Sequence, residues 1–265
     1  MKQTFSLLIY FIALSTIFGQ QKMNITFEAR YELNFKEYKN QKPDFLKNTF
    51  ILLGNEKESF FKNMSVYVKD SLLDYGKIRE TGDIQKDFET FGKYVPDLPF
   101  TVFFKEGQIK FTNQIESNSY YYEEPIDFKW KITKELKNIN GIKCIKATTT
   151  KWGRNWIAYY SPKHAMPFGP YKFNGLPGLI FEIYDEKKDY NFLIYKYKKR
   201  VSNNFITHQS SKSKKTSKIQ YEKIRKQAAI HPYFLTNEKD AKLLRKGQQF
   251  LEEKEKNYNP IELTD

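Results

Sequence analysis

Residues 126–150 read IDFKWKITKELKNINGIKCIKATTT and have the pattern of a β-hairpin. Apolar side chains alternate with polar or charged ones at the start of this stretch, at Ile126, Phe128, Trp130 and Ile132. An alternation with period two is typical of a strand with one buried face. Residues 138–141 supply a turn, and residues 142–150 form a second, threonine-rich strand. Because a tight turn joins the two strands, the stretch predicts an antiparallel sheet.

Further strands are expected on both sides of this hairpin. Before it, the patterns predict strands over residues 25–35, 50–53, 101–105 and 108–112; after it, over residues 156–160, 179–184 and 191–197. Residues 77–99 look irregular, and residues 116–125 look like a tyrosine-rich loop. The sequence therefore predicts a meander of about eight strands that forms an open or partly closed barrel.

Helices are expected at two places. Phe60, Met64, Val68 and Leu72 recur every four residues and predict one short helix packed on the sheet. Near the C-terminus, Ser217 and Gln220 fit a capping box that opens one helix, and a second is predicted from about residue 238 to residue 254. The expected fold class is mainly β (α+β), with a β domain over residues 20–200 and a basic linker with two helices over residues 201–265.

The N-terminus has the pattern of a secretory signal peptide. Lys2 precedes an uncharged apolar run over residues 5–18, and the small residue Gly19 follows it. The run is shorter than the ~20 residues that span a bilayer as a helix. We therefore expect residues 1–19 to be cleaved, and the mature protein to be soluble in the periplasm or at the cell surface.

The composition limits the classes of partner. The formal net charge is +14, which favours anionic partners such as anionic lipid or lipopolysaccharide. Export makes nucleic acid the weakest of the anionic partners, and none is expected. Ten Lys or Arg residues lie between Lys198 and Lys226, which either touch such a surface or form a solvated linker. Cys144 is the only cysteine, so no internal disulfide is expected.

Glycine and proline mark the connection before residue 179. Its turn residues are Gly169, Pro170, Gly175, Leu176, Pro177 and Gly178, followed by Leu179 and Ile180 at the start of a strand. Pro177 and Gly178 suit the two central positions of a type II turn, in which Gly178 has a positive φ.

Residues 175–180 spell GLPGLI, and the chain resembles the GLPGLI family of exported Bacteroidetes proteins. Surrounding residues support the resemblance: Gly141, Cys144, Ala147, Gly153, Arg154, Trp156, Ala158, Tyr160, the run 169–173 and the ending 259–263. The chain departs from the family pattern at Tyr159, where Trp is common, and at residues 163–166. The resemblance implies export and a shared fold, without a known reaction. The layout also resembles the open barrels of periplasmic lipoprotein carriers, which hold acyl chains.

Five residues are candidates for binding an apolar or amphipathic ligand, and these are Arg154, Trp156, Tyr160, Phe173 and Leu179. Ordinary core packing is the alternative, because aromatic residues dominate protein cores. The three histidines lack the spacing of metal ligands, and no serine has the context of a nucleophile. No catalytic residue, metal or cofactor is therefore expected.

Three functions stay open at this point. The first is an exported, non-enzymatic envelope protein that binds an apolar or amphipathic ligand, such as a lipid, or docks on an outer-membrane protein. The second is a periplasmic hydrolase that uses His164, Arg154 and a carboxylate. The third is a purely structural interaction module.

Overall fold

The computed structural model describes residues 21–40, 42, 45–200, 205–208, 213–232 and 241–263. Its strands are β1 (Gln21–Asn24), β2 (Phe27–Phe35), β3 (Leu46–Gly54), β4 (Glu58–Asn63), β5 (Thr101–Lys105), β6 (Gln108–Ile115), β7 (Asn118–Pro125), β8 (Lys131–Ile139), β9 (Ile142–Lys151), β10 (Arg154–Ser161), β11 (Leu179–Asp185), β12 (Tyr190–Lys199), β13 (Phe205–His208) and β14 (Lys214–Lys215). The predicted signal peptide lies outside the described residues.

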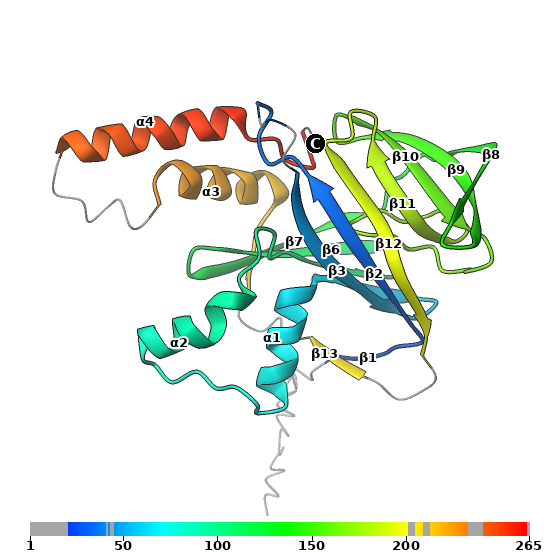
Figure 1. Ribbon diagram of the computed structural model, residues 1–265, viewed down its shortest axis with the longest axis horizontal. Coiled ribbons are helices and arrows are strands. Elements are labelled where there is room, and N and C mark those ends of the chain that lie inside the picture. Colours follow the sequence, from blue (N-terminus) through cyan, green and yellow to red (C-terminus); the bar gives the residue numbers. More distant parts are fainter. Residues whose placement is uncertain are drawn as a thin grey trace, which may run out of the picture.

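Twelve of these strands form one sheet, in the order β14-β7-β6-β5-β4-β3-β2-β12-β11-β10-β9-β8 (Figure 1). Neighbours are antiparallel except β14 and β7, which are parallel. Among the described residues, the edge strands β14 and β8 do not pair with each other, so the sheet is open. The predicted mainly-β class, with an open meander and added helices, is confirmed.

The large sheet consists of two meanders that meet at its centre. Strands β2 to β7 are neighbours in chain order, and so are β8 to β12. The two sets join where β2 pairs with β12, with Phe35 opposite Tyr190 and Phe27 opposite Lys199. The first predicted long strand therefore lies beside the last.

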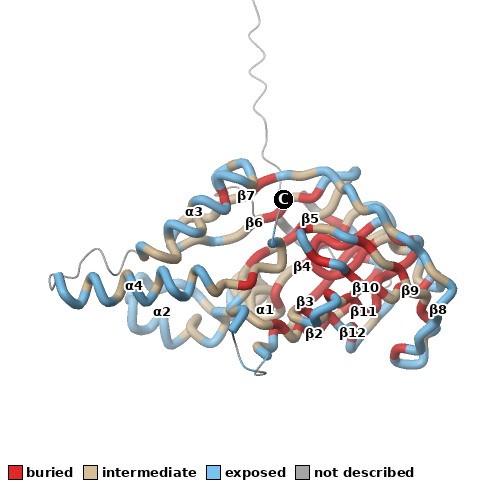
Figure 2. The backbone as a smooth tube through the Cα atoms, turned by 90° about the horizontal axis from the view of Figure 1, so that it is seen from above, coloured by how far each residue is buried: buried red, intermediate tan, exposed pale blue. Residues whose placement is uncertain are grey.

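The alternation predicted for residues 25–35 matches the burial of β2. Its core-facing side chains are 1% exposed or less, namely Phe27, Ala29, Tyr31, Leu33 and Phe35. Figure 2 shows that buried residues concentrate in the strands, whereas α2 (Ile84–Phe91) and α4 (Ala241–Asn257) have no buried residue. The core of the molecule is thus the sheet and the loops that it encloses.

The connection between the two meanders corrects one prediction. β8 begins at Lys131, so Ile126, Phe128 and Trp130 precede it instead of forming its apolar face. The chain must cross here from β7, beside one edge, to β8 at the other edge, and it leaves the ladder to do so. The apolar side chains still pack inward, and the ring centroids of Phe128 and Trp130 are 5.6 Å apart.

The tyrosine-rich segment predicted as a loop is strand β7 instead. It pairs with β6 from Gln108 opposite Pro125 to Ile115 opposite Asn118. Tyrosine favours strands because its ring packs well on a pleated surface. Tyr122 accordingly points into the core and is 2% exposed.

The helices of the first meander differ in part from the prediction. α1 (Met64–Asp74) begins after Phe60, which belongs to β4, and Asn63 caps it by accepting the N–H of Ser65. Residues 77–99, predicted as irregular, contain α2 and the 3-10 turn η1 (Gly92–Tyr94). Asp83 starts α2 by accepting two backbone N–H groups, a cap that we did not recognise.

The C-terminal helices lie side by side on one flank (Figure 1). α3 (Lys218–Ile230) is capped by Ser217, whose hydroxyl accepts the N–H of Gln220 as predicted. Arg225 of α3 lies 2.8 Å from Glu255 of α4. After α4 the chain returns to the sheet as an extended segment, residues 258–263, which we call the C-terminal strap. No helix among the described residues is long and apolar enough to cross a membrane.

Candidate functional site

The five residues predicted to bind a ligand all lie inside the molecule. Arg154, Trp156 and Tyr160 are on β10, Phe173 is in the loop that follows, and Leu179 begins β11. Their exposed fractions are 5%, 1%, 3%, 1% and 0%, respectively. The four apolar side chains belong to one core cluster. They therefore pack against one another and against the rest of the core, with little surface left for a ligand.

The loop over residues 162–178 explains this burial, because the sheet curls around it. The ring of Phe168 lies 6.3 Å from that of Phe27 on β2 and 4.9 Å from that of Phe104 on β5. The ring of Phe173 lies 4.6 Å from that of Trp156 on β10. Side chains of one loop thus contact strands of both meanders and fill the space that an acyl chain would need.

Close packing, rather than a type II turn, requires glycine at positions 169 and 178 of this loop. Gly178 has φ +159°, far from the roughly +80° of a type II turn, whereas Gly175 has φ +85°. A Cβ on Gly178 would lie 2.2 Å from the carbonyl oxygen of Ser161. A Cβ on Gly169 would lie 2.6 Å from Cδ1 of Ile180. The φ of Gly178 shows that the predicted turn type is wrong. Glycine is needed at position 178 because the main chain of Ser161 lies too close for a side chain.

One small cavity lies between the loop and the sheet in the described part of the chain. A cavity beside Phe61, Phe104 and Asn174 has room for about one water molecule. The side-chain oxygen of Asn174 is buried and has no hydrogen-bond partner among the described residues. A single water molecule fits this cavity and could donate a hydrogen bond to the Asn174 oxygen.

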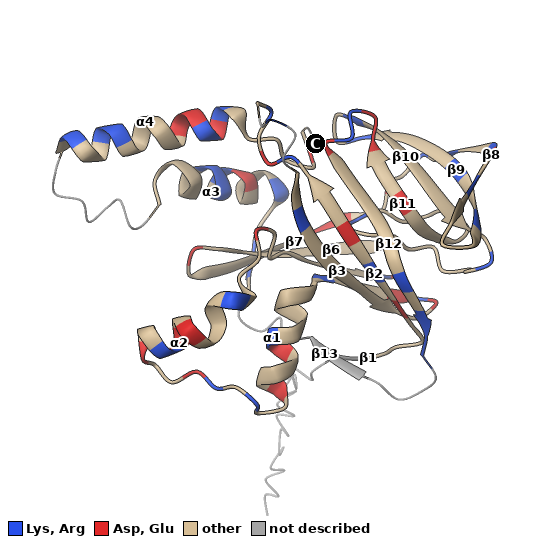
Figure 3. Ribbon diagram, viewed as in Figure 1, with Lys and Arg blue, Asp and Glu red and all other residues tan. Residues whose placement is uncertain are grey.

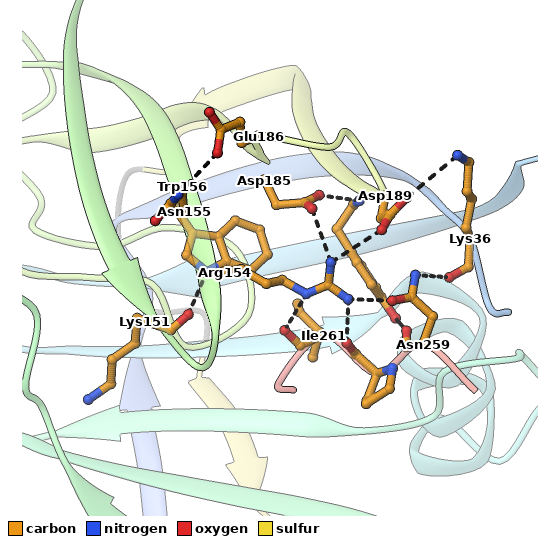
Figure 4. Close-up of polar contacts among 12 residues, drawn as sticks. Lys36, Lys151, Arg154, Asn155, Trp156, Asp185, Glu186, Asp189, Asn259 and Ile261 are labelled. Atoms are coloured by element: carbon orange, nitrogen blue, oxygen red, sulfur yellow. Dashed lines mark hydrogen bonds and ion pairs between the residues drawn. The ribbon is translucent and has the colours of Figure 1, made fainter. Parts of the chain in front are cut away.

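Arg154 is surrounded by acceptors of its own chain (Figure 4). Nη1 donates to Asp185 Oδ2 at 3.0 Å, and Nη2 donates to Asn259 Oδ1 and to the carbonyl of Pro260, both at 2.7 Å. Nε donates to the carbonyl of Ile261 at 3.1 Å. The guanidinium thus joins the end of β11 to the C-terminal strap.

Two more contacts use the rest of this guanidinium. Nη1 also donates to Asp189 Oδ2 at 3.5 Å, and the ring of Tyr190 lies 5.0 Å from the guanidinium carbon. The Tyr190 hydroxyl donates to the carbonyl of Asn259 at 2.6 Å. Because an arginine has five N–H donors, these contacts occupy all of them. Arg154 is therefore a structural clamp in this state, with no free edge for a carboxylate or a phosphate.

Lys172 is a second buried cation beside the strap, and its side chain is 0% exposed. Its Nζ lies 2.5 Å from Glu124 Oε1 and 2.6 Å from Glu262 Oε1, and it donates to the Tyr122 hydroxyl at 2.8 Å. Lys218 of α3 lies 2.8 Å from the other oxygen of Glu262. Two ammonium groups and two carboxylates therefore balance, as a buried set of charges must.

Aromatic rings enclose the Lys172 ammonium on the remaining sides. Their centroids lie 4.8–5.6 Å from Nζ, and they belong to Tyr122, Phe111, Tyr171 and Trp152. A cation above an aromatic face is attracted by the ring quadrupole. This cage holds the chain's own lysine.

The charges and burial around Lys172 shift the pKa of its neighbours. Burial alone would raise the pKa of Glu262, but the ammonium groups of Lys172 and Lys218 hold that pKa below its ordinary value. Burial raises the pKa of Tyr171 well above its usual range, and the carboxylate of Glu262 adds to the rise. Tyr171 therefore keeps its proton and donates it to Glu262 at 2.5 Å.

The residues of the hydrolase alternative do not meet. Arg154 opens β10 and His164 follows its other end, so the strand itself separates them by roughly 23 Å at ~3.3 Å per residue. His164 Nδ1 lies 3.1 Å from Ser161 Oγ, but Ser161 is 0% exposed. Burial and the charges of Lys163 and Lys199 lower the pKa of His164. The charges that act on this histidine are thus positive, unlike the carboxylate that orients a catalytic base.

The described part of the chain has neither a cluster of metal ligands nor a reactive thiol. No group of three or more His, Cys, Asp or Glu side chains lies there where it could hold a metal ion. Cys144 is buried, and burial raises its pKa to about 11. Its thiol is therefore protonated at neutral pH and unreactive.

No family model and no curated protein sequence matches this chain. Two solved structures of PNGF-II, in the C2 and P21 space groups, match it with a TM-score of 0.53 each and with 11% and 14% sequence identity. The matches cover 77% of this chain but 33% and 34% of the PNGF-II chains, so this chain spans about a third of their length. At such low identity the likeness shows a shared fold alone.

Sequence reasoning missed the strap and the cation that holds its acid. Arg154 and residues 259–263 were noticed separately, but nothing in the sequence placed them together. Lys172 stands between Tyr171 and Phe173, and this aromatic setting is the only local hint that a lysine there is buried.

Proposed function

We propose that this chain is an exported, non-enzymatic envelope protein that acts by docking on a partner at its surface. The observation that carries the proposal is that apolar side chains of residues 162–178 pack into the core against the sheet, and that the cavity described beside them has room for about one water. Ligand pockets usually need about 300 Å³ or more. Surface docking therefore fits this structure better than storage of an apolar ligand.

The docking surface that we propose is the α1–α2 lobe, residues 64–97. Several large apolar side chains of this lobe are exposed, namely Val68 (37%), Tyr75 (78%), Ile84 (89%), Phe88 (75%) and Val95 (78%). Ile84 and Phe88 lie one helical turn apart on α2 and share a face. Exposed apolar side chains that share a face, as Ile84 and Phe88 do, mark interaction sites more often than single exposed residues do.

Charge favours a protein partner for this lobe over an anionic lipid surface. The lobe has five Lys or Arg residues and seven Asp or Glu residues, whereas the whole chain has a net charge of +14 (Figure 3). An acidic surface is repelled by anionic lipid, so a partner with apolar and basic groups fits better. An outer-membrane protein is the partner class that we propose.

The predicted contact of the basic run 198–226 with anionic lipid or lipopolysaccharide has weaker support. Several of its cations already bind acids of the same chain. Lys215 lies 2.9 Å from Glu123, and Lys218 is held by Glu262. Fewer charges are then free to attract a membrane surface.

Export and family rest on the sequence. The basic and apolar pattern of residues 1–19 supports export, and the GLPGLI run with its surroundings supports a place in that family. A docking role agrees with both, since neither implies a reaction.

A paired substitution tests the proposed surface. In Ile84→Ser/Phe88→Ser, two exposed side chains lose their apolar character, so folding should persist while sedimentation with outer-membrane vesicles of the host falls at least tenfold. Ile132→Ser/Leu136→Ser on β8 is the matched control, because these side chains are 49% and 54% exposed. Equal binding of both variants would contradict the proposal. Binding to protein-free vesicles of the same lipids would instead identify a lipid partner.

A further inference from the structure

The C-terminal strap lies against the sheet in the way that an extended peptide lies on a receptor. Tyr258 forms an antiparallel bridge with Tyr38, just beyond the end of β2. The Asn259 N–H donates to the carbonyl of Glu37 at 2.8 Å, and the Lys39 N–H donates to the carbonyl of Asn257 at 2.7 Å. The strap therefore adds a short strand beside residues 36–39, which is a common mode of peptide recognition.

Groups of the sheet also bind the main chain of the strap further along. Arg154 donates to the carbonyls of Pro260 and Ile261. The carbonyl of Trp152 accepts the N–H of Leu263 at 2.9 Å. Contacts to the main chain supply affinity that does not depend on the sequence of the bound segment.

Two sites read side chains of the strap. Asn259 is 3% exposed; its oxygen accepts from Arg154, and its nitrogen donates to the carbonyl of Lys36 at 2.9 Å. A side chain without both a donor and an acceptor would leave one buried partner unpaired. This first site therefore favours a side chain that both donates and accepts, as the asparagine amide does.

The second site selects a carboxylate. Glu262 meets the ammonium groups of Lys172 and Lys218 and the hydroxyl of Tyr171. Between the two sites, Ile261 packs against the core cluster, and Pro260 needs no partner for a missing N–H. The strap residues that lie in the groove thus follow the pattern Asn-Pro-apolar-Glu.

We propose that this groove is a peptide-recognition site, and that an extended segment of a partner protein with the pattern Asn-Pro-apolar-Glu enters it in place of the strap. The groove side chains that bind the strap come mainly from β10, the loop 162–178 and β12, and all of these elements precede the strap in the chain. The strap follows α4, which has no buried residue. Because α4 does not enter the core, the strap is bound to the sheet in the way that a tethered ligand would be. This site is separate from the α1–α2 lobe, and the failure of either proposal leaves the other standing.

Cutting the full-length folded protein tests the inference. A protease site placed between α3 and α4 lets the strap leave together with α4 after cleavage. We expect a fluorescent peptide with the sequence of residues 257–265 to bind the cut protein and to bind the uncut chain at least tenfold more weakly, because the tethered strap competes. Peptides with Asn259→Ala or Glu262→Gln should bind the cut protein at least tenfold more weakly. A peptide with Leu263→Ala should bind within threefold, because Leu263 is 41% exposed.

Three results would overturn the proposal. The first is a folded cut protein, by circular dichroism, that binds no peptide. The second is equal binding of the three altered peptides. The third is unfolding of the cut protein as its fragment leaves, which would make the strap an integral part of the fold. A dimer in which two uncut chains exchange straps would also overturn the proposal, because the occupant of the groove would then be a second copy of this chain.

Discussion

The ammonium of Lys172 lies 2.6 Å from the carboxylate of Glu262, and both groups are shielded from water. Lys172 belongs to the loop that fills the sheet, and Glu262 belongs to the strap that closes the chain. The pair therefore couples the loop 162–178 to the C-terminal strap. Removing Glu262 would leave Lys172 with Glu124 alone, and removing Lys172 would leave Glu262 with Lys218 alone. Either change unbalances a buried set of charges, which destabilises a fold.

Low pH should weaken the ion pair between Lys172 and Glu262. The pKa of Glu262 in the folded protein lies below its ordinary value of 4.5. Its ionised form thus stabilises the fold above that ordinary value, and the stabilisation disappears as the pH falls through the folded pKa. We expect Glu262→Gln to lower Tm at pH 7 and to reduce the loss of Tm between pH 5 and pH 3, as followed by scanning calorimetry. Parallel curves for the two proteins would contradict this role.

Arg154→Lys should release the strap without disrupting the core. An ammonium has three donors and no fork geometry, so the acceptors on Asn259 and Pro260 cannot all be satisfied. We expect a loss of about 2–3 kcal/mol in the free energy of unfolding and faster amide hydrogen exchange at Leu263. Arg79→Lys, at an exposed position, is the control and should change neither quantity. Unchanged exchange at Leu263 in Arg154→Lys would show that other contacts hold the strap.

Phe173→Ala should affect stability and not the binding of a ligand. Phe173 is 1% exposed and packs on Trp156 and Trp152 at centroid distances of 4.6 and 5.4 Å. Truncation of such a ring typically costs about 3–5 kcal/mol, which urea unfolding would measure. Phe88→Ala is the matched control, since its ring is 75% exposed, and a change within about 0.5 kcal/mol is expected. A Phe173→Ala protein of normal stability would instead point to a loosely packed pocket.

Gly178→Ala should be far more harmful than Gly76→Ala. At Gly178 an added Cβ would lie 2.2 Å from the carbonyl oxygen of Ser161, so the main chain must move. At Gly76 nothing lies within 4 Å of the added Cβ, and the only cost is its φ of +63°, about 1 kcal/mol. We expect Gly178→Ala to lose more than about 3 kcal/mol or to fail to fold. Similar urea midpoints for the two variants would mean that the loop 162–178 adapts easily.

The sequence predicts best those features that are local. The alternation in β2 and the hairpin of β11 and β12 follow from a period of two and a turn a few residues long. The cap at Ser217 follows from the hydroxyl and the Gln220 position alone. Each of these features depends on residues close together in the chain, so the pattern contains the information.

The features missed depend on residues far apart in the chain. Residues 126–130 alternate like a strand, but they leave the ladder because β7 and β8 lie at opposite ends of the sheet order. The tyrosines of β7 look like loop residues until Tyr122 is seen to pack against Phe111 on β6. Arg154 was predicted as a candidate for ligand binding, whereas its partners in the folded chain are Asp185 and Asn259. A single sequence therefore shows that such residues need partners but does not identify them.

The pairing of β2 with β12 has a consequence for how the chain folds. Phe35 on β2 pairs with Tyr190 on β12. One edge of β2 therefore stays unpaired while more than half of the chain is synthesised. Closing so long a loop before its contacts form is slow, and it makes the topology one of high contact order. Until β12 arrives, the exposed edge of β2 can pair with another unfolded molecule. Refolding yield should therefore fall steeply as protein concentration rises, because β2 must find a partner strand that lies far away in the chain.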